Sequence, residues 1–284
     1  MKRTVYLNGE YLPEDEAKIS IFDRAVLFGD AIYEVAGVLD SKLIDFEGHM
    51  QRYHSSLSKL GIPAPLDNEQ VLTAFRQLVK LNDIDEGLVY MQITRGEADR
   101  DFLWQGELLP TVFMFTQDKL PDENKAAKSG VILESVDDIR WVRRDIKSVN
   151  LLAQVLAKKQ ASDAGAYEAL MIDSDGYITE CGSNSFFIVT DDLLLTHPLD
   201  NNILPGITRK ALVTLCNTHG IRLVETRFRL DEALKANEAF ISSASSYVLP
   251  VVQINQQKIG SGTPGPYYQK LRGLYIDHAR ASSL

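Results

Sequence analysis

The pattern of apolar and polar residues predicts β-hairpins at the start of the chain. Residues 5–7 and 11–12 are β-forming and flank the pair Asn8-Gly9, which is typical of a two-residue hairpin turn. Residues 31–39 form a longer β-rich stretch that ends at the turn signal Asp40-Ser41. We therefore expect the chain to begin with antiparallel strands.

Helices are expected next. Met50, Tyr53, Leu57 and Leu60 recur at helical spacing, which predicts a helix over residues 47–60 that Gly61 ends. A similar pattern predicts a second helix, over residues 67–81, and β-rich stretches follow at 88–94 and 111–116.

In the second half of the chain, predicted strands alternate with predicted helices. Strands outnumber helices and hairpin turns recur, which favours an α+β fold with largely antiparallel sheets and flanking helices over a doubly wound parallel sheet. The expected strands are 131–134, 168–172, 185–189, 223–226, 239–242 and 248–254, and the expected helices are 148–164, 208–218 and 267–281.

A polar segment near the middle of the chain separates these halves. Residues 117–130 contain Asp, Glu, Lys and Pro without an apolar period, and 284 residues suffice for about two domains of roughly 150 residues each. We predict a smaller α+β domain over residues 1–118, a linker over 119–130, and a larger α+β domain over 131–284 that carries Lys147.

Charge and cysteine usage narrow the class of protein. The net charge of -9 makes nucleic acid a poor partner. Cys181 and Cys216 lie far apart without a Cys or His at metal-ligand spacing, which indicates neither a disulfide framework nor a metal site. The first residues reach a turn before an apolar signal region could form, and no run approaches about 18 apolar residues. We expect a cytoplasmic protein that binds no membrane.

One lysine suggests covalent chemistry. Lys147 stands at the expected junction between a strand and a helix, after Arg140, Arg143 and Arg144. Cationic neighbours favour the neutral amine of a lysine, which is the form that makes a Schiff base. A solvated lysine beside a helix start would have the same local sequence.

Other segments could hold a phosphorylated ring. Glu180 is a lone carboxylate before a small-residue loop, where burial would require a partner such as a protonated pyridine nitrogen. Gly206 precedes a helix whose Ile207 and Thr208 amides could bind phosphate, and the serine-rich run 242–246 could add a second contact. Such helix starts and polar loops also occur without ligands. Together, however, these groups are those of an enzyme that uses pyridoxal 5'-phosphate (PLP).

These segments resemble the class IV family of PLP-dependent aminotransferases, and most closely its D-amino acid aminotransferases. The resemblance covers nearly the whole chain and implies the two-domain fold of fold type IV PLP enzymes. It is carried by FGDAIYEV at 28–35, TRG at 94–96, DIRW at 138–141, DIKS at 145–148, THP at 196–198, GITR at 206–209 and VLPVV at 248–252.

The resemblance implies a role for each matching residue. Lys147 would form the Schiff base with PLP and move the α-proton, and Glu180 would bond to the pyridine nitrogen. Tyr33 and Arg100 would bind the substrate carboxylate, with Arg100 reaching in from the neighbouring subunit of a homodimer. The phosphate would be held by Arg52, Ile207, Thr208 and Ser245, with Ser243 and Ala244 beside it.

Two positions depart from the family pattern. Many D-amino acid aminotransferases carry R-x-H at the carboxylate site, whereas Phe102 occupies the histidine position here, so one donor is missing. The family pattern also places Asn five residues after the glutamate, where this chain has Ser185, with Asn184 one residue earlier.

The sequence therefore predicts a homodimeric aminotransferase that moves the amino group of D-alanine, or a similar D-amino acid, to 2-oxoglutarate by a ping-pong mechanism. An L-branched-chain aminotransferase or an aminodeoxychorismate lyase on the same scaffold is the alternative. A remote alternative is a non-catalytic nucleotide-binding module that uses GSGTPG at 260–265, although a proline interrupts this glycine motif and too little chain follows for a βαβ unit.

Overall fold

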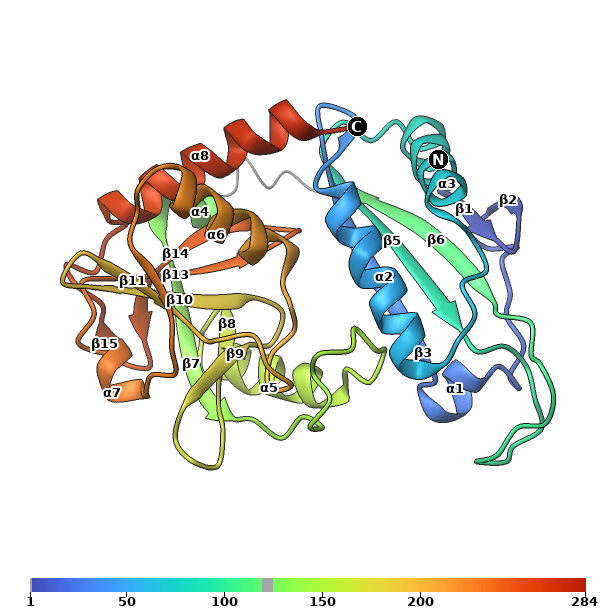
Figure 1. Cartoon of the computed structure of the whole chain (residues 1–284), viewed down its shortest axis with the longest axis horizontal. Helices are drawn as coiled ribbons and strands as arrows, with labels where there is room; N and C mark the ends of the chain where they lie inside the picture. The colour runs from blue at the N-terminus through green and yellow to red at the C-terminus, as the bar shows by residue number, and fades with distance from the viewer. Residues whose placement is uncertain (1, 119–124) are drawn as a thin grey trace. The chain divides into compact units, whose positions relative to one another are not determined.

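The computed structural model describes residues 2–118 and 125–284, which form two compact units (Figure 1). Within these residues, the first unit comprises 2–118, Ile146–Asn150 and Ala279–Leu284, and the second comprises 125–145 and Leu151–His278. Each unit has its own sheet and its own apolar core.

The first unit contains a six-stranded sheet in which every neighbouring pair is antiparallel. Asn8 and Gly9 form the predicted hairpin turn, and both have positive φ angles, of 49° and 102°. The predicted strands are confirmed. The strand order is β2-β1-β6-β5-β3-β4, with β1 (Thr4–Leu7), β2 (Glu10–Pro13), β3 (Ala31–Leu39), β4 (Lys42–Leu43), β5 (Gly87–Thr94) and β6 (Val112–Asp118).

Both predicted helices of this unit pack their apolar stripes onto its sheet. Tyr53 of α2 (Phe46–Leu60) and Phe75 of α3 (Asn68–Leu81) are fully buried in the same core, and burial of each ring contributes roughly 1.5–3 kcal/mol. The short helix α1 (Arg24–Phe28), which the apolar pattern does not predict, precedes β3.

The second unit contains a nine-stranded mixed sheet, of which five of eight pairings are antiparallel. The predicted α+β class is therefore confirmed. The strand order is β12-β11-β10-β13-β14-β7-β8-β9, and β15 pairs with β14; the bounds are β7 (Val131–Asp137), β8 (Glu168–Ile172), β9 (Ile178–Cys181), β10 (Ser185–Thr190), β11 (Leu193–Thr196), β12 (Leu223–Glu225), β13 (Glu238–Ser243), β14 (Tyr247–Ile254) and β15 (Gln257–Lys258).

The helices of this unit are short except for the last. They are α4 (Lys125–Ser129), α5 (Leu152–Asp163), α6 (Ile207–Thr218), α7 (Leu230–Ala233) and α8 (Pro266–Ser282), whose final residues lie in the first unit. The expected linker at 119–130 falls partly on 119–124, which lie outside the described residues, while Lys125–Ser129 form α4. The division into domains at 118 and 131 stays a prediction.

The segment Ile146–Asn150 does not begin a helix, although the sequence predicts one from residue 148. Ser148 forms a β-bridge with Ile32, and the Lys147 carbonyl accepts a hydrogen bond of 2.9 Å from the Tyr33 amide. Pairing with β3 satisfies these backbone groups, so α5 starts at Leu152. The same pairing explains why the lysine segment belongs to the first unit, although it follows the expected linker in the sequence.

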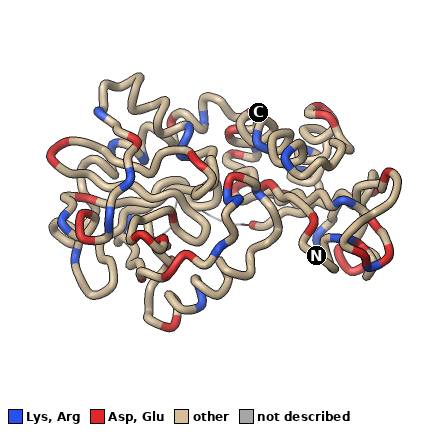
Figure 2. Tube along the Cα trace, turned by 60° about the horizontal axis from the view of Figure 1, so that its bottom comes forward, with Lys and Arg blue, Asp and Glu red and all other residues tan. Residues whose placement is uncertain are grey.

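Charge is distributed over the whole chain. Segments with Lys and Arg and segments with Asp and Glu are scattered over the described trace (Figure 2). Among the described residues, every helix is either too short or too polar to be a membrane span.

The glycine motif at 260–265 forms a turn before α8. The Glu238 carboxylate accepts hydrogen bonds of 3.0 Å from the amides of Tyr267 and Tyr268, in the first turn of that helix. A carboxylate therefore already occupies the position that a nucleotide phosphate would need, and its charge would repel one. This contact argues against the remote alternative of a nucleotide-binding module.

We predict that Glu238→Ala lowers the free energy of unfolding by about 1–2 kcal/mol, because two helix amides lose a charged partner. Chemical denaturation would measure it. Asp163→Ala is the control, because the exposed Asp163 pairs with Lys159 on its own helix and should cost less than about 0.5 kcal/mol. Equal effects of the two substitutions would contradict this capping role.

Candidate active site

Lys147 is fixed at its backbone and half-buried at its side chain. Its amide donates to Ser56 Oγ on α2 at 3.3 Å, and its carbonyl accepts from Tyr33 on β3. Its Nζ lies 4.1 Å from the centroid of the Tyr33 ring. The structure thus brings together two of the predicted site residues, Lys147 and Tyr33, and leaves the amine over an aromatic face.

The three arginines before Lys147 are engaged elsewhere. Arg143 pairs with Asp145 at 3.0 Å, Arg144 pairs with Asp138 at 3.3 Å, and Arg140 contacts two carboxylates. Each of the three arginines therefore has a carboxylate partner within the second unit, and the expected effect of their charges on the lysine amine stays a prediction.

Arg52 on α2 is held by a buried carboxylate that the sequence analysis did not single out. Its Nε and Nη2 donate to the two oxygens of Glu34 on β3, each at 2.7 Å. His49 Nδ1 lies 2.8 Å from Glu34 Oε2. Burial opposes ionisation of Glu34, but Arg52 and His49 outweigh it and lower its pKa from 4.5 to about 2. Spacing on α2 could have revealed His49, which lies about one turn from Arg52.

Arg100 lies in an exposed loop of the first unit. The guanidinium of buried Arg24 holds this loop in place. It donates hydrogen bonds to the carbonyls of Asp101, at 2.8 Å, and Phe102, at 3.3 Å. Phe102 is 76% exposed and packs against Phe28. Among the described residues, Arg100 contacts the Phe28 ring and is not part of the Lys147–Tyr33 group.

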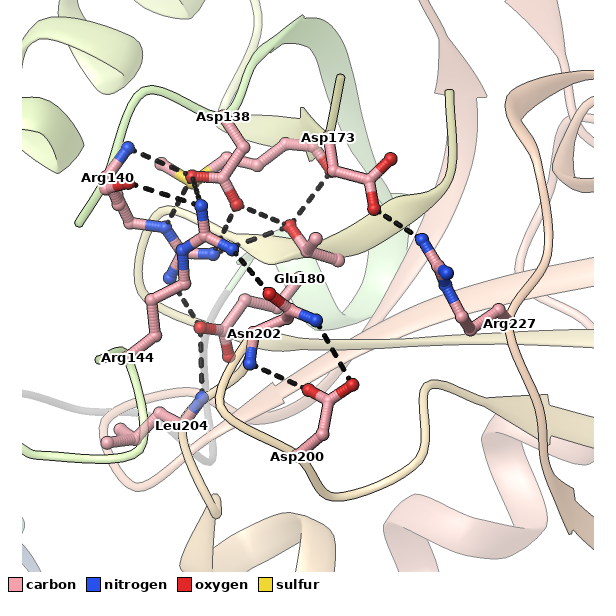
Figure 3. A network of polar contacts seen from close by, with 11 residues as sticks. Asp138, Arg140, Arg144, Asp173, Glu180, Asp200, Asn202, Leu204 and Arg227 are labelled. Atoms are coloured by element: carbon pink, nitrogen blue, oxygen red, sulfur yellow. Dashed lines mark hydrogen bonds and ion pairs between the residues drawn. The ribbon is translucent and has the colours of Figure 1, made fainter. Parts of the chain in front are cut away.

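Glu180 lies within β9 rather than beyond its end, and it is buried in a polar network (Figure 3). Its Oε1 accepts hydrogen bonds from Arg140 Nη1 at 2.5 Å and from the Leu204 amide at 3.1 Å. Burial raises the pKa of Glu180, and Arg140 opposes that rise. Arg140 is therefore the direct partner of a predicted site residue, a contact that the sequence analysis missed.

Leu204 leads directly to the start of α6. Gly206 is the N-cap and supplies no side chain to that end, so the buried first turn at Ile207 and Thr208 has no side-chain cap among the described residues. A Cβ at Gly206 would lie 2.7 Å from Ser185 Oγ, so a larger residue would have to displace that hydroxyl. An uncapped helix start of this kind suits an anion.

The serine-rich turn between β13 and β14 lies beside this helix start. Ser242 pairs with Ser185 across β13 and β10, and its buried Oγ has no hydrogen-bond partner in the described part of the chain. Ser243 Oγ lies 2.7 Å from Ser246 Oγ and 3.3 Å from Ser245 Oγ. Together with the half-buried Ala244, these residues form a compact polar turn.

Asn184 supports that turn from within the protein. Its Nδ2 donates to fully buried Glu168 at 2.8 Å, and its Oδ1 accepts from Ser246 at 3.2 Å. Ser185 takes the place where the family pattern has asparagine. Asn184 therefore has a structural function one residue earlier, between a buried carboxylate and the serine turn.

The Glu34 pair generates a pH prediction. Because the pKa of Glu34 is lower in the folded protein, its stabilisation is present above about pH 4.5 and is lost as the pH falls toward about 2. We expect Glu34→Gln to destabilise the protein by about 3–5 kcal/mol at neutral pH, because Arg52 loses its buried partner. The deficit should shrink in acid, as chemical denaturation at several pH values would show.

The exposed Glu47, on the same helix α2, provides the matched control. Glu47→Gln should change stability by less than about 0.5 kcal/mol at every pH. A deficit in Glu34→Gln that did not vary with pH would contradict the ionised pair.

Comparisons with known proteins place the chain in a family. The family model described as amino-transferase class IV matches residues 31–254. The chain is 36% identical over 262 residues to a D-alanine aminotransferase of Bacillus licheniformis, covering 92% of each protein.

Solved structures show the same fold. A branched-chain amino acid aminotransferase of Escherichia coli superposes with a TM-score of 0.91 at 22% identity, covering 98% of this chain and 95% of that one. A T.th. branched-chain amino acid aminotransferase, solved with pyridoxamine 5'-phosphate, gives a TM-score of 0.89 at 24% identity, covering 98% and 94%. The match to the family model and to the Bacillus enzyme establishes that this chain belongs to the class IV aminotransferases.

Proposed function

We propose that this chain is a PLP-dependent transaminase that moves the amino group of D-alanine, or a similar D-amino acid, to 2-oxoglutarate. The observation that carries the proposal is the Glu180–Leu204–α6 arrangement in the second unit. It combines a buried carboxylate, suited to a ring nitrogen, with an uncapped helix start, suited to a phosphate. The similarity to D-alanine aminotransferases supports the choice of a D-amino acid donor.

The donors present fit PLP in number and kind. The amides of Ile207 and Thr208 and the serine turn at Ser243, Ala244 and Ser245 would hold the phosphate, together with Arg52. The unpartnered Oγ of buried Ser242 is one more donor beside that turn, within the described part of the chain. Glu180 would hold the pyridine nitrogen, whose protonated ring supplies the electron sink of this chemistry.

Lys147 would carry the proton transfer. Its Nζ would bond covalently to the aldehyde carbon of the cofactor. Once displaced by the substrate amine, it would take the α-proton and return it to that same cofactor carbon. The backbone bonds to Ser56 and Tyr33 would keep the amine in place between these two steps. The segment Ile146–Asn150 therefore contributes orientation as well as the nucleophile.

The substrate carboxylate would be bound by Tyr33 and Arg100. An arginine can bind a carboxylate through two parallel hydrogen bonds, and Tyr33 lies at the lysine amine. Phe102 would supply no hydrogen-bond donor at the position where many D-amino acid aminotransferases carry histidine. The substrate carboxylate would therefore depend more on Arg100. An L-branched-chain aminotransferase or an aminodeoxychorismate lyase is the alternative that a test of donors would reveal.

The first test is the visible absorption spectrum of the purified protein with PLP, before and after addition of D-alanine. We expect a yellow protein whose visible band is lost with D-alanine and persists with L-alanine. Lys147→Ala should abolish turnover without unfolding the protein, whereas Lys159→Ala, at an exposed lysine, should retain it. A band that responds only to L-amino acids would overturn the D-specificity, and no band at all would overturn PLP dependence.

We further propose that the protein is a cytoplasmic homodimer. The two cysteines, Cys181 and Cys216, are free and buried, which suits a reducing compartment. The first unit also exposes apolar side chains around α1 and the Arg100 loop, which we name the α1 patch. The α1 patch consists of Ile21, Phe22, Val26, Phe102, Leu103, Trp104 and Leu109, with exposed fractions from 43% to 89%.

A charge in the α1 patch should separate the subunits. We expect Leu109→Glu to raise the dimer dissociation constant at least about 100-fold, because burying a charge in an apolar interface is costly. Sedimentation would measure it. Leu81→Glu, at an exposed leucine of α3, is the control and should leave the oligomeric state unchanged. A wild-type protein that sediments as a monomer would contradict the proposed dimer.

A further inference from the structure

Arg140 lies between two carboxylates and uses its whole guanidinium fork. Its Nε and Nη2 donate to Asp138 at 2.9 Å and 2.7 Å, and its Nη1 donates to Glu180 (Figure 3). The side chains of Arg140, Asp138 and Glu180 are 5%, 0% and 7% exposed. At such burial, each carboxylate requires a cation or donor to remain charged.

Asp138 has further partners that balance its charge. Arg144 Nη2 lies 3.3 Å from Asp138 Oδ1, and the Thr179 hydroxyl donates to Asp138 Oδ2 at 2.7 Å. Two arginines therefore face two carboxylates in this network. Because Arg144 also compensates Asp138, the charge of Arg140 is available to Glu180.

The contacts to Glu180 fall on one oxygen. Arg140 and the Leu204 amide both donate to Oε1, and neither contact uses Oε2. Oε1 is thus committed to the protein, and the carboxylate is anchored so that its second oxygen remains for another donor.

We propose that Arg140 is a positioning residue that keeps Glu180 ionised and anchored, so that a proton stays on the ring nitrogen of PLP. This inference rests on the proposed function. Without Arg140, the buried Glu180 would favour its neutral form and take the proton from the ring nitrogen onto Oε2. One N–H bond would break and one O–H bond would form, with no change in oxidation state.

The experiment must separate this role from a structural one, because the Arg140 guanidinium also pairs with Asp138 two residues away. Arg140→Gln and Asp138→Asn both remove the Asp138–Arg140 ion pair, but only Arg140→Gln removes the charge that faces Glu180. Arg140→Lys restores a positive charge, and Arg143→Gln removes a neighbouring arginine that pairs with Asp145 instead.

The readout is the nitrogen NMR shift of the holoenzyme loaded with PLP that is isotope-labelled at the ring nitrogen. We expect the wild type, Asp138→Asn, Arg140→Lys and Arg143→Gln to show a protonated ring nitrogen. Arg140→Gln should shift to the value of an unprotonated pyridine, with turnover lower by on the order of 10²-fold.

Each other outcome either supports or overturns the inference. An unchanged shift in Arg140→Gln, or the same shift in Asp138→Asn, would overturn the inference and leave PLP dependence intact. The inference is supported if Arg140→Gln alone loses PLP and Arg140→Lys keeps a protonated ring. It is overturned in favour of a purely structural role if Arg140→Gln, Arg140→Lys and Asp138→Asn all lose PLP. A wild type that binds no PLP would instead overturn the proposed function itself.

Discussion

The structure depends on burying carboxylates without leaving their charges unpaired. A buried carboxylate is costly in a low-dielectric interior unless an arginine and further donors face it. Glu34 meets this requirement with Arg52 and His49 in the first unit, and Glu180 meets it with Arg140 and a backbone amide in the second. In both units, the pair lies at residues to which we assign cofactor binding.

The two ion pairs differ in how many carboxylate oxygens the arginine contacts. Arg52 closes on both oxygens of Glu34, which fixes the direction of the arginine. Arg140 closes on one oxygen of Glu180, which anchors the carboxylate and leaves its other oxygen out of both contacts. The same ion-pair chemistry can therefore orient a cation in one place and an anion in the other.

The helix starts also differ in whether a side chain caps their free amides. Asp67 and Gln70 close the start of α3 with a capping box, and Glu238 closes the start of α8. The start of α6 has glycine as its N-cap and no such side chain among the described residues. A free helix start next to Glu180 is the feature that makes phosphate binding a consistent proposal, since its amides and dipole favour an anion.

The sequence by itself determined most elements, because apolar periodicity and turn residues are local signals that act within a few residues. It specified the strands of the first sheet and the helix that ends at Gly61, and its motifs indicated the family. Its helix start at residue 148 was wrong. Ser148 pairs with Ile32, and a contact between residues more than a hundred positions apart leaves no signal in the local pattern. Only the tertiary structure decided that Arg140 pairs with Glu180 and that Glu34 pairs with Arg52, because the partner of a buried charge is set by distance in space and by burial.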